Sequence, residues 1–351
     1  MVGALIVRPP EEGGEVVGSG WHRQVGGPHA EVEALREAGD RARGATLYVT
    51  LEPCSHFGRT PPCVDAVLAA GISRVVACHG DPDPRVSGRG FAKLRAAGVA
   101  VEVGVLAEEA VRLNFRFLIA ATERRPAVTL KWAMSLDGRI ATATGQSQWI
   151  SSPEGRKWGL ALREEHDAIL VGSGTVLADD PRLDRRLGLA AGLNVRVVMD
   201  RRLRTPPEAR LFQVPGPVLI YAQADVQGEA VARRRALEER GAEVLLLPAV
   251  EPAAVLADLY ERGVRSVLIE GGGEIHASFV GSGCFDRVMI DCAPLLLGGR
   301  TAPGPLGGPG FAALAEAARL ENLEARRRGG DLILTGYRKG CLPELFKSVG
   351  A

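Results

Sequence analysis

The chain has 351 residues, of which 46% are hydrophobic and 24% charged, proportions that are ordinary for a globular protein with room for two domains. A formal net charge of +1 excludes the overall basic field that nucleic-acid or anionic-membrane partners favour. No apolar run approaches the roughly 20 residues of a membrane span, and the first residues lack a signal-peptide pattern. Six scattered cysteines are too few for a disulfide framework, so we expect reduced thiols and a cytoplasmic location.

The first part of the chain predicts alternating strands and helices. Gly39 ends the first helix as a C-cap, and Pro61-Pro62 opens the second, because proline fits the first turn of a helix. Strands are expected at 1–7, 15–21, 46–50, 74–78 and 99–103, and helices at 30–38, 63–70, 91–97 and 106–121. This alternation predicts a mostly parallel sheet with helices on both faces.

A charged junction at residues 122–126 divides the chain into expected domains at 1–122 and 123–351. Ser152 and Pro153 predict the N-cap and first residue of a helix in the second domain. Further helices are expected at 229–240 and 252–262, and strands at 127–133, 168–171, 195–199, 218–221, 243–247, 266–269, 287–292 and 331–337. The stretch 297–310, rich in glycine and proline, is expected to be a long loop. Both domains therefore belong to the α/β class.

One imidazole, two thiols and a carboxylate lie close together in the first domain. His29, Cys54 and Cys63 provide three ligands for one zinc ion, which leaves a fourth tetrahedral position for water, as in catalytic zinc sites. A structural zinc site or buried thiols are the plainer interpretations. However, all three residues precede or begin helices at one end of the predicted sheet, where open α/β folds bind ligands. A thiolate at a helix N-terminus is also stabilised there, which favours metal binding by Cys63.

The carboxylate of Glu31 follows the histidine by two residues and is free to move protons. A His-x-Glu pair upstream of Pro-Cys is the signature of zinc-dependent nucleobase deaminases, in which the glutamate is not a ligand. We therefore expect zinc to activate a water molecule, and Glu31 to act as the general acid and base that transfers its proton to the departing ammonia.

The spacing of the two cysteines indicates a narrower group within the zinc-dependent deaminases. Eight residues separate them, with Gly20-Trp21-His22 upstream and Asp81-Pro82-Asp83-Pro84 downstream. In these features the chain resembles the deaminase half of the bifunctional riboflavin-biosynthesis deaminase/reductases. The resemblance implies a cytidine-deaminase-like three-layer α/β/α domain that deaminates a diaminopyrimidinone ribosylamino 5′-phosphate. It places substrate contacts on His22, Arg59, Thr60 and Asp81.

Two departures from that family are visible. Asp83 stands where the family usually has Asn, and an acid would weaken binding of a phosphorylated substrate unless it faces solvent. The family also has a helix and a Pro-Asn-Pro loop, with a substrate-binding Asn, ahead of the point where this sequence begins. Either the start codon is misassigned, or this half lacks a core helix and part of its pocket. On that ground we expect the chain as written to deaminate poorly.

The second domain contains a glycine-rich turn between a strand and a helix. Residues 270–274 read Glu-Gly-Gly-Gly-Glu, and such glycines let backbone N–H groups approach a phosphate at a helix N-terminus. The turn does not have the Gly-x-Gly-x-x-Gly dinucleotide pattern, so by itself it is a weak signal. The same domain contains two further segments of interest, the polar stretch 134–150 and the glycine-containing stretch 171–181, which leads into a short helix.

Together these segments resemble the reductase half of the same enzymes, a dihydrofolate-reductase-like α/β domain that uses NADPH. The resemblance implies hydride transfer to the ribose C1′, which opens the ring to a ribityl chain. It places NADPH on Ala133, Trp149, Thr175, Asp179, Gly272, Gly273, Glu274, Ile275, His276, Ala277 and Ser278, and substrate on Lys131, Ser147, Arg163, Leu183, Arg186 and Glu270. Arg163 and Arg186 suit the substrate phosphate. Arg201 is expected either to reach the 2′-phosphate of NADPH or to be a solvated side chain.

Three alternatives remain at this point. One is a reductase whose deaminase half is impaired, and another is a nucleic-acid-editing deaminase, against which the near-neutral charge argues. The third is a zinc-stabilised nucleotide-binding regulatory protein, against which the retained Glu31 argues. We expect a small phosphorylated pyrimidine as the substrate, no nucleic-acid or membrane partner, and a homo-oligomer.

Overall fold

The computed structural model describes residues 2–23, 26–58, 60–83, 86–188, 194–225 and 227–342. The described chain forms two compact units, the first comprising the residues up to Glu123 together with Leu342, and the second comprising Arg124–Cys341. None of the helices in the described ranges is long and apolar enough to cross a membrane.

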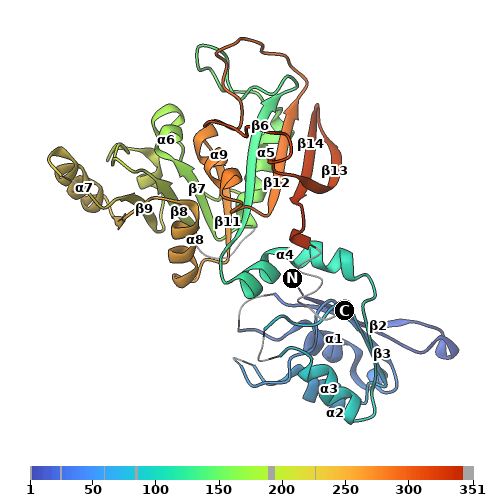
Figure 1. Ribbon diagram of the computed structural model, residues 1–351. Helices are drawn as coiled ribbons and strands as arrows, with labels where there is room; N and C mark the ends of the chain where they lie inside the picture. The colour runs from blue at the N-terminus through green and yellow to red at the C-terminus, as the bar shows by residue number, and fades with distance from the viewer. Residues whose placement is uncertain are drawn as a thin grey trace. The chain divides into compact units, whose positions relative to one another are not determined.

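The first unit is built on a sheet with strand order β2-β1-β3-β4-β5. Strands β3, β4 and β5 are parallel, whereas β1 is antiparallel to both β2 and β3. The strands are β1 (Gly3–Val7), β2 (Val16–Trp21), β3 (Thr46–Val49), β4 (Arg74–Ala77) and β5 (Ala100–Val103), and the helices are α1 (Ala30–Ala38), α2 (Cys63–Ala69), α3 (Arg89–Ala96) and α4 (Ala107–Glu123) (Figure 1).

Helices α1, α2 and α3 bury their apolar residues in one core against this sheet. The core combines alanines of α1 and valines of α2 with inward-facing residues of the strands, such as Ile6 and Leu47. Alternation along the strands explains this packing, since Leu47 and Val49 are buried while Tyr48 between them is exposed. Strands β2, β3 and β4 run in the same direction and are followed by α1, α2 and α3, so these helices begin at the carboxyl edge of the strands.

Helix α1 approaches β2 unusually closely because β2 has glycines at the contact. A Cβ on Gly18 would collide with the carbonyl oxygen of Ala34, and one on Gly20 with that of Ala30. Only glycine leaves room for the helix backbone at these two positions. Since α1 begins directly after His29, this contact sets where the start of α1 lies.

The second unit contains a sheet with strand order β10-β9-β8-β7-β11-β6-β12-β14-β13 among the described residues. Its strands are parallel except at one end, where β14 is antiparallel to β12 and β13. The strands are β6 (Ala127–Ser135), β7 (Ala168–Gly172), β8 (Val195–Met199), β9 (Val218–Gln223), β10 (Ala242–Leu247), β11 (Ser266–Gly271), β12 (Arg287–Ala293), β13 (Leu320–Arg328) and β14 (Asp331–Arg338). The helices are α5 (Pro153–Glu164), α6 (Ser173–Asp179), α7 (Glu229–Glu239), α8 (Pro252–Glu261) and α9 (Gly273–Gly281).

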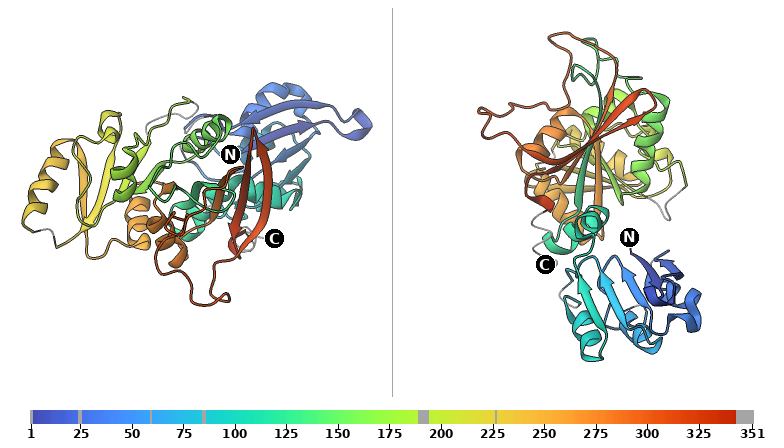
Figure 2. Two further views of the ribbon diagram at one scale, coloured as in Figure 1. Left: turned by 90° about the horizontal axis from the view of Figure 1, so that it is seen from above. Right: turned by 90° about the vertical axis from the view of Figure 1, so that its right-hand side faces the viewer.

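Helices cover both faces of this sheet (Figure 2). Helices α8 and α9 pack on one face, through residues such as Leu256 and Phe279. On the other face, α5 packs through Leu162 and α7 through Leu237. The result is a three-layer α/β/α unit, in agreement with the α/β class predicted from sequence.

Strand β13 is an element that the sequence did not predict. Its sequence, Leu-Glu-Asn-Leu-Glu-Ala-Arg-Arg-Arg, lacks apolar alternation, and most of its residues are exposed. It forms because its backbone pairs with β14 at the end of the sheet. Charged edge strands of this kind also discourage pairing with other chains.

The contact between α1 and β2 leads to a first prediction. A Gly20→Ala variant should lose about 1–3 kcal/mol of unfolding free energy, because the added methyl must displace the backbone of α1. It should also bind zinc more weakly, since His29 moves with the helix. The control is Gly3→Ala on β1, where a Cβ meets its nearest neighbour at 3.9 Å, an ordinary contact. Equal denaturation midpoints and zinc retention for both variants would contradict this account.

Candidate active sites

The predicted metal ligands come together in the first unit. The ligand atoms of His29, Cys54 and Cys63 all lie within 4.8 Å of one another. His29 Nδ1 is 3.0 Å from the Cys63 sulfur and 3.6 Å from the Cys54 sulfur. His29 immediately precedes α1, Cys63 is the first residue of α2, and Cys54 lies in the loop after β3. Among the described residues, no other group of three potential metal ligands converges in this way. His56, which lies between the two cysteines in the sequence, and His79 are not part of the group.

The pKa values of the two cysteine thiols are shifted in opposite directions. The hydrogen bond from the Cys63 thiol lowers the pKa of Cys54 to about 4, and the backbone N–H of Cys63 donates to the Cys54 sulfur at 3.3 Å. The same thiol contact, together with burial, raises the pKa of Cys63. A thiolate, a thiol and an imidazole that converge in this way fit the donor set of zinc, which binds both sulfurs as thiolates.

Glu31 lies in the first turn of α1 and is 3% exposed. Burial raises the pKa of its carboxyl to about 7. Its Oε2 atom is buried and has no hydrogen-bond partner among the described residues. A buried carboxyl with an uncommitted oxygen beside the ligand group fits a proton carrier rather than a structural anchor.

Two of the residues expected to contact substrate lie beside His29. The Thr60 hydroxyl is 3.3 Å from His29 Nε2, the ring nitrogen that faces away from the sulfurs. The His22 ring packs edge-on against the His29 ring with centroids 5.3 Å apart. Thr60 is therefore placed to fix the orientation of the ligating imidazole, as outer partners of metal-bound histidines do. Arg59 lies outside the described residues.

Asp81, a further expected substrate contact, is partly buried. Burial raises the pKa of its carboxyl to about 6, and its Oδ1 accepts the backbone N–H of Asp83 at 2.8 Å. Asp83 is partly buried, as Asp81 is, and its negative charge adds to the rise in the pKa of Asp81.

Glu52 is a residue of this site that the sequence analysis did not single out. Its carboxylate is 3% exposed and accepts four backbone N–H groups, from Asp81, Gly88, Gly90 and Phe91, at 2.9–3.3 Å. These bonds join the segment that contains Cys54 to the Asp81 loop and to the start of α3. The position of Glu52, two residues before Cys54, was the only hint of this role in the sequence. The role could not be predicted, because the N–H donors lie 29–39 residues further along the chain.

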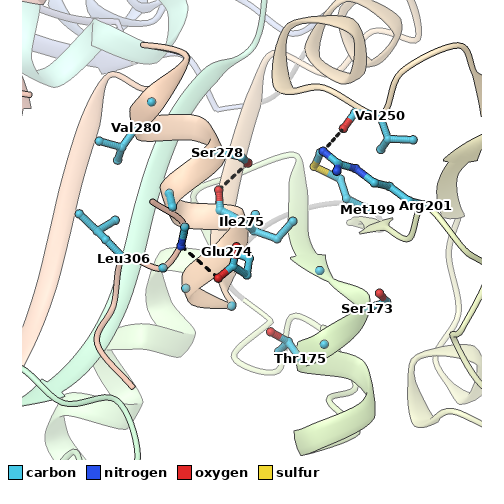
Figure 3. A pocket seen from close by; sticks show the side chains of 18 of the residues that line it. Ser173, Thr175, Met199, Arg201, Val250, Glu274, Ile275, Ser278, Val280 and Leu306 are labelled. Carbon is cyan, nitrogen blue, oxygen red and sulfur yellow. Dashed lines mark hydrogen bonds between the residues drawn. The ribbon is translucent and has the colours of Figure 1, made fainter. Parts of the chain in front are cut away.

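The second unit contains a cavity of about 700 Å³, within the size range of small-molecule and cofactor sites. Figure 3 shows Thr175 and Ser173 facing the helix that bears Glu274, Ile275 and Ser278 across this space. The backbone N–H of Gly308 donates to the Glu274 carboxylate at 3.1 Å, so the long loop after β12 closes one side.

Most of the residues expected to bind NADPH line this cavity: Thr175, Arg201, Gly272, Gly273, Glu274, Ile275, Ala277 and Ser278. His276 is placed differently, because it is 2% exposed and its ring nitrogens face the carbonyls of Pro305 and Ile269. Ala133, Trp149 and Asp179 also lie outside the lining. The lining also includes residues that were not predicted from the sequence, namely Ser173, Met199, Arg202, Arg204, Val250 and the loop residues Leu306–Phe311.

The start of α9 has the features that a dinucleotide phosphate requires. Gly272 has a positive φ of 84°, and a Cβ on Gly273 would press on the carbonyl oxygen of Gly304 at 3.1 Å. The glycines therefore bring backbone N–H groups to the cavity at the N-terminus of a helix. Arg201, Arg202 and Arg204 on one turn add positive charge to the lining.

A charged cluster connects several residues expected to bind substrate. Arg163 Nε and Nη2 donate to the two carboxylate oxygens of Glu270 at 2.8 and 2.5 Å. Burial opposes ionisation of Glu270, but Arg163 outweighs it and holds the pKa of the carboxyl below its ordinary value. Arg186 Nε donates to Asp184 Oδ1 at 2.6 Å. Arg163 also donates to the backbone carbonyl of Asp184 at 3.2 Å, so its guanidinium contacts both Glu270 and Asp184.

The remaining substrate candidates are more dispersed. Lys131 on β6 points toward α5, with its Nζ 3.2 Å from the position of a Cβ on Gly159. The Ser147 hydroxyl donates to Asp179 at 3.1 Å. Leu183 is 1% exposed and packs in the core, so its side chain is not presented to a ligand.

Comparison with known proteins gives the family. Residues 126–334 match the model of the RibD C-terminal domain, and residues 1–79 match the cytidine and deoxycytidylate deaminase zinc-binding region. The riboflavin biosynthesis protein RibD of Aquifex aeolicus is 41% identical over 334 residues, which cover 95% of this chain and 90% of the relative. The chain belongs to the RibD family. RibD of Escherichia coli is 40% identical over 348 residues, covering 95% and 92% of the two chains.

Solved structures of the RibD family agree with this assignment. Acinetobacter baumannii RibD superposes with a TM-score of 0.83 at 35% identity and covers 96% of this chain and 92% of its own. A Thermotoga maritima diaminohydroxyphosphoribosylaminopyrimidine deaminase/5-amino-6-(5-phosphoribosylamino)uracil reductase gives 0.80 at 33% identity, with coverage of 96% and 91%. The chain is thus a bifunctional deaminase and reductase of riboflavin biosynthesis, with the cytidine-deaminase-like and reductase domains that the sequence predicted.

A substitution of Glu52 tests whether its hydrogen bonds hold the Cys54 segment of this RibD-family zinc site in place. Glu52→Gln should destabilise the chain by about 2–4 kcal/mol, because an amide cannot accept all four backbone N–H groups and adds donors of its own. Zinc should be lost at lower chelator concentration, since the Cys54 segment loses its anchor. Glu102→Gln is the control, because Glu102 forms only an exposed pair with Arg74. If both variants unfold and release zinc alike, Glu52 does not anchor the site.

Proposed function

We propose that the chain hydrolytically deaminates 2,5-diamino-6-ribosylamino-4(3H)-pyrimidinone 5′-phosphate, and then uses NADPH to reduce the ribosyl group to a ribityl chain. The observation that carries the proposal is the convergence of His29, Cys54 and Cys63 beside the buried carboxyl of Glu31. The Thermotoga maritima relative is named for a deaminase and reductase acting on such compounds, which supports this substrate.

In the deaminase half, His29, Cys54 and Cys63 would hold zinc, and Thr60 would keep the imidazole oriented through Nε2. Zinc, when bound, supplies a water molecule of lowered pKa. Glu31 would accept the first water proton at its uncommitted oxygen and deliver it to the ring nitrogen. It would then carry the proton left on the attacking oxygen to the amine, which departs as ammonia while the ring carbonyl forms. A carboxyl with a pKa near 7 suits both directions of transfer.

In the reductase half, the glycines at the start of α9 would receive the phosphates of NADPH, and Thr175 would face them from α6. NADPH, when bound, supplies the hydride. Arg201 lines the same cavity and would bind the 2′-phosphate. Glu270, held ionised by Arg163, accepts hydrogen bonds from the pyrimidine or the ribose hydroxyls.

The alternatives raised from the sequence are not favoured. Both halves match their own family models, and full-length relatives of the RibD family cover nearly the whole chain. A reductase with an impaired deaminase half and a zinc-stabilised regulatory protein therefore lack support. A homo-oligomeric state, a cytoplasmic location and the lack of nucleic-acid or membrane partners stay predictions.

A single substitution separates the two activities. Glu31→Gln should retain zinc but release ammonia from the diaminopyrimidinone at least about 100-fold more slowly, because general acid–base transfer contributes that much or more. NADPH oxidation by the same variant on the already deaminated pyrimidine should match the wild type. The measurements are zinc stoichiometry, ammonia release and absorbance at the NADPH band.

Two results would contradict the proposal. Undiminished ammonia release by Glu31→Gln would remove Glu31 from the chemistry. Failure of the wild type to oxidise NADPH with the deaminated pyrimidine would refute the reductase assignment. A Glu33→Gln variant is the matched control, since Glu33 lies in the same turn of α1 but pairs with Arg36.

A further inference from the structure

The segment that follows α6 carries arginines whose guanidinium groups are used in two different ways. The Arg185 guanidinium donates to backbone carbonyls, at 3.1 Å to that of Arg163 and also to that of His166. The side chains of Arg182 and Arg186, by contrast, are 43% and 46% exposed and both contact Asp184. Arg185 therefore has a structural role, whereas Arg182 and Arg186 present charge to solvent.

Asp184 holds these two arginines in a specific way. Its side chain is 7% exposed, and its two oxygens each accept one Nε–H group, from Arg182 at 3.1 Å and from Arg186 at 2.6 Å. Within the described residues, neither arginine has a further hydrogen bond at its Nη atoms. One buried carboxylate thus orients two guanidinium groups while leaving the Nη donors of both available.

The charges around Asp184 favour an anion. Burial opposes ionisation of Asp184, but Arg186 and Arg182 outweigh it and hold the pKa of the carboxyl below its ordinary value. Arg163 lies 3.9 Å from the same carboxylate but is committed to Glu270 through two hydrogen bonds. With three guanidiniums and two carboxylates the cluster keeps an excess positive charge, carried by the two exposed arginines.

We propose that Arg182 is a second phosphate-binding residue of the reductase site, paired with Arg186 by Asp184. The inference rests on the proposed function, in which Arg186 binds the 5′-phosphate of the substrate. A phosphate monoester carries up to two negative charges and three acceptor oxygens, which a pair of guanidiniums satisfies better than one. Asp184 is then a positioning residue for both arginines.

The test compares Arg182→Gln and Arg186→Gln in reductase kinetics at saturating NADPH. The substrate is the deaminated phosphoribosylamino pyrimidine, assayed beside its dephosphorylated form. Each variant should raise the KM for the phosphorylated substrate about tenfold, the effect of losing one charge-assisted hydrogen bond, and leave kcat unchanged. With the dephosphorylated substrate, both variants should have the KM of the wild type. Arg235→Gln on α7, an equally charge-neutralising change at an exposed pair, should have no effect.

The outcomes distinguish this inference from the function on which it rests. If Arg186→Gln raises the KM while Arg182→Gln behaves like Arg235→Gln, Arg182 does not bind phosphate and the proposed function stands. If Arg182→Gln raises the KM equally for both substrates, its effect is structural and the inference is overturned. If the wild type does not discriminate between the two substrates, both the phosphate site and the proposed substrate are wrong.

Discussion

The metal centre depends on how closely one helix can approach one strand. Gly18 and Gly20 remove the side chains of β2 where α1 crosses it, so the helix backbone lies against the strand. The N-terminus of α1 therefore has a fixed position, which gives one ligand from His29 and one proton carrier from Glu31. Helix α2 packs in the same core and brings Cys63 to the same point. Close backbone packing of this kind tolerates little adjustment, because protein interiors are packed like crystals.

Buried carboxylates organise the loops around both sites. Glu52 collects backbone N–H groups from two segments in the first unit, and Asp184 collects guanidinium groups in the second. A buried carboxylate is stable only if its lone pairs are satisfied, so each acid fixes the groups that satisfy it. Glu31 differs from Glu52 and Asp184, since its Oε2 atom has no hydrogen-bond partner among the described residues. Glu52 and Asp184 therefore hold the loops around the sites, whereas Glu31, beside the metal ligands, keeps an oxygen available for proton transfer.

Local patterns in the sequence were sufficient for most of the helices and strands. The helix expected at 30–38 and the strand expected at 195–199 have those bounds in the structure. Strand β13 was missed because pairing with β14, rather than apolar alternation, stabilises it. The metal ligands were predictable because their types and spacing are specific to zinc chemistry. The partners of Glu52 and Asp184, and the inward orientation of His276, depend on tertiary contacts that no local pattern encodes.

The central claim is that His29, Cys54 and Cys63 form a three-ligand zinc site with an open position beside Glu31. X-ray absorption at the zinc edge of the purified chain tests it most directly. We predict one zinc per chain, with two sulfur neighbours at about 2.3 Å and nitrogen or oxygen neighbours at about 2.0–2.1 Å. Three or more sulfur neighbours, or a chain that binds no zinc, would contradict the account.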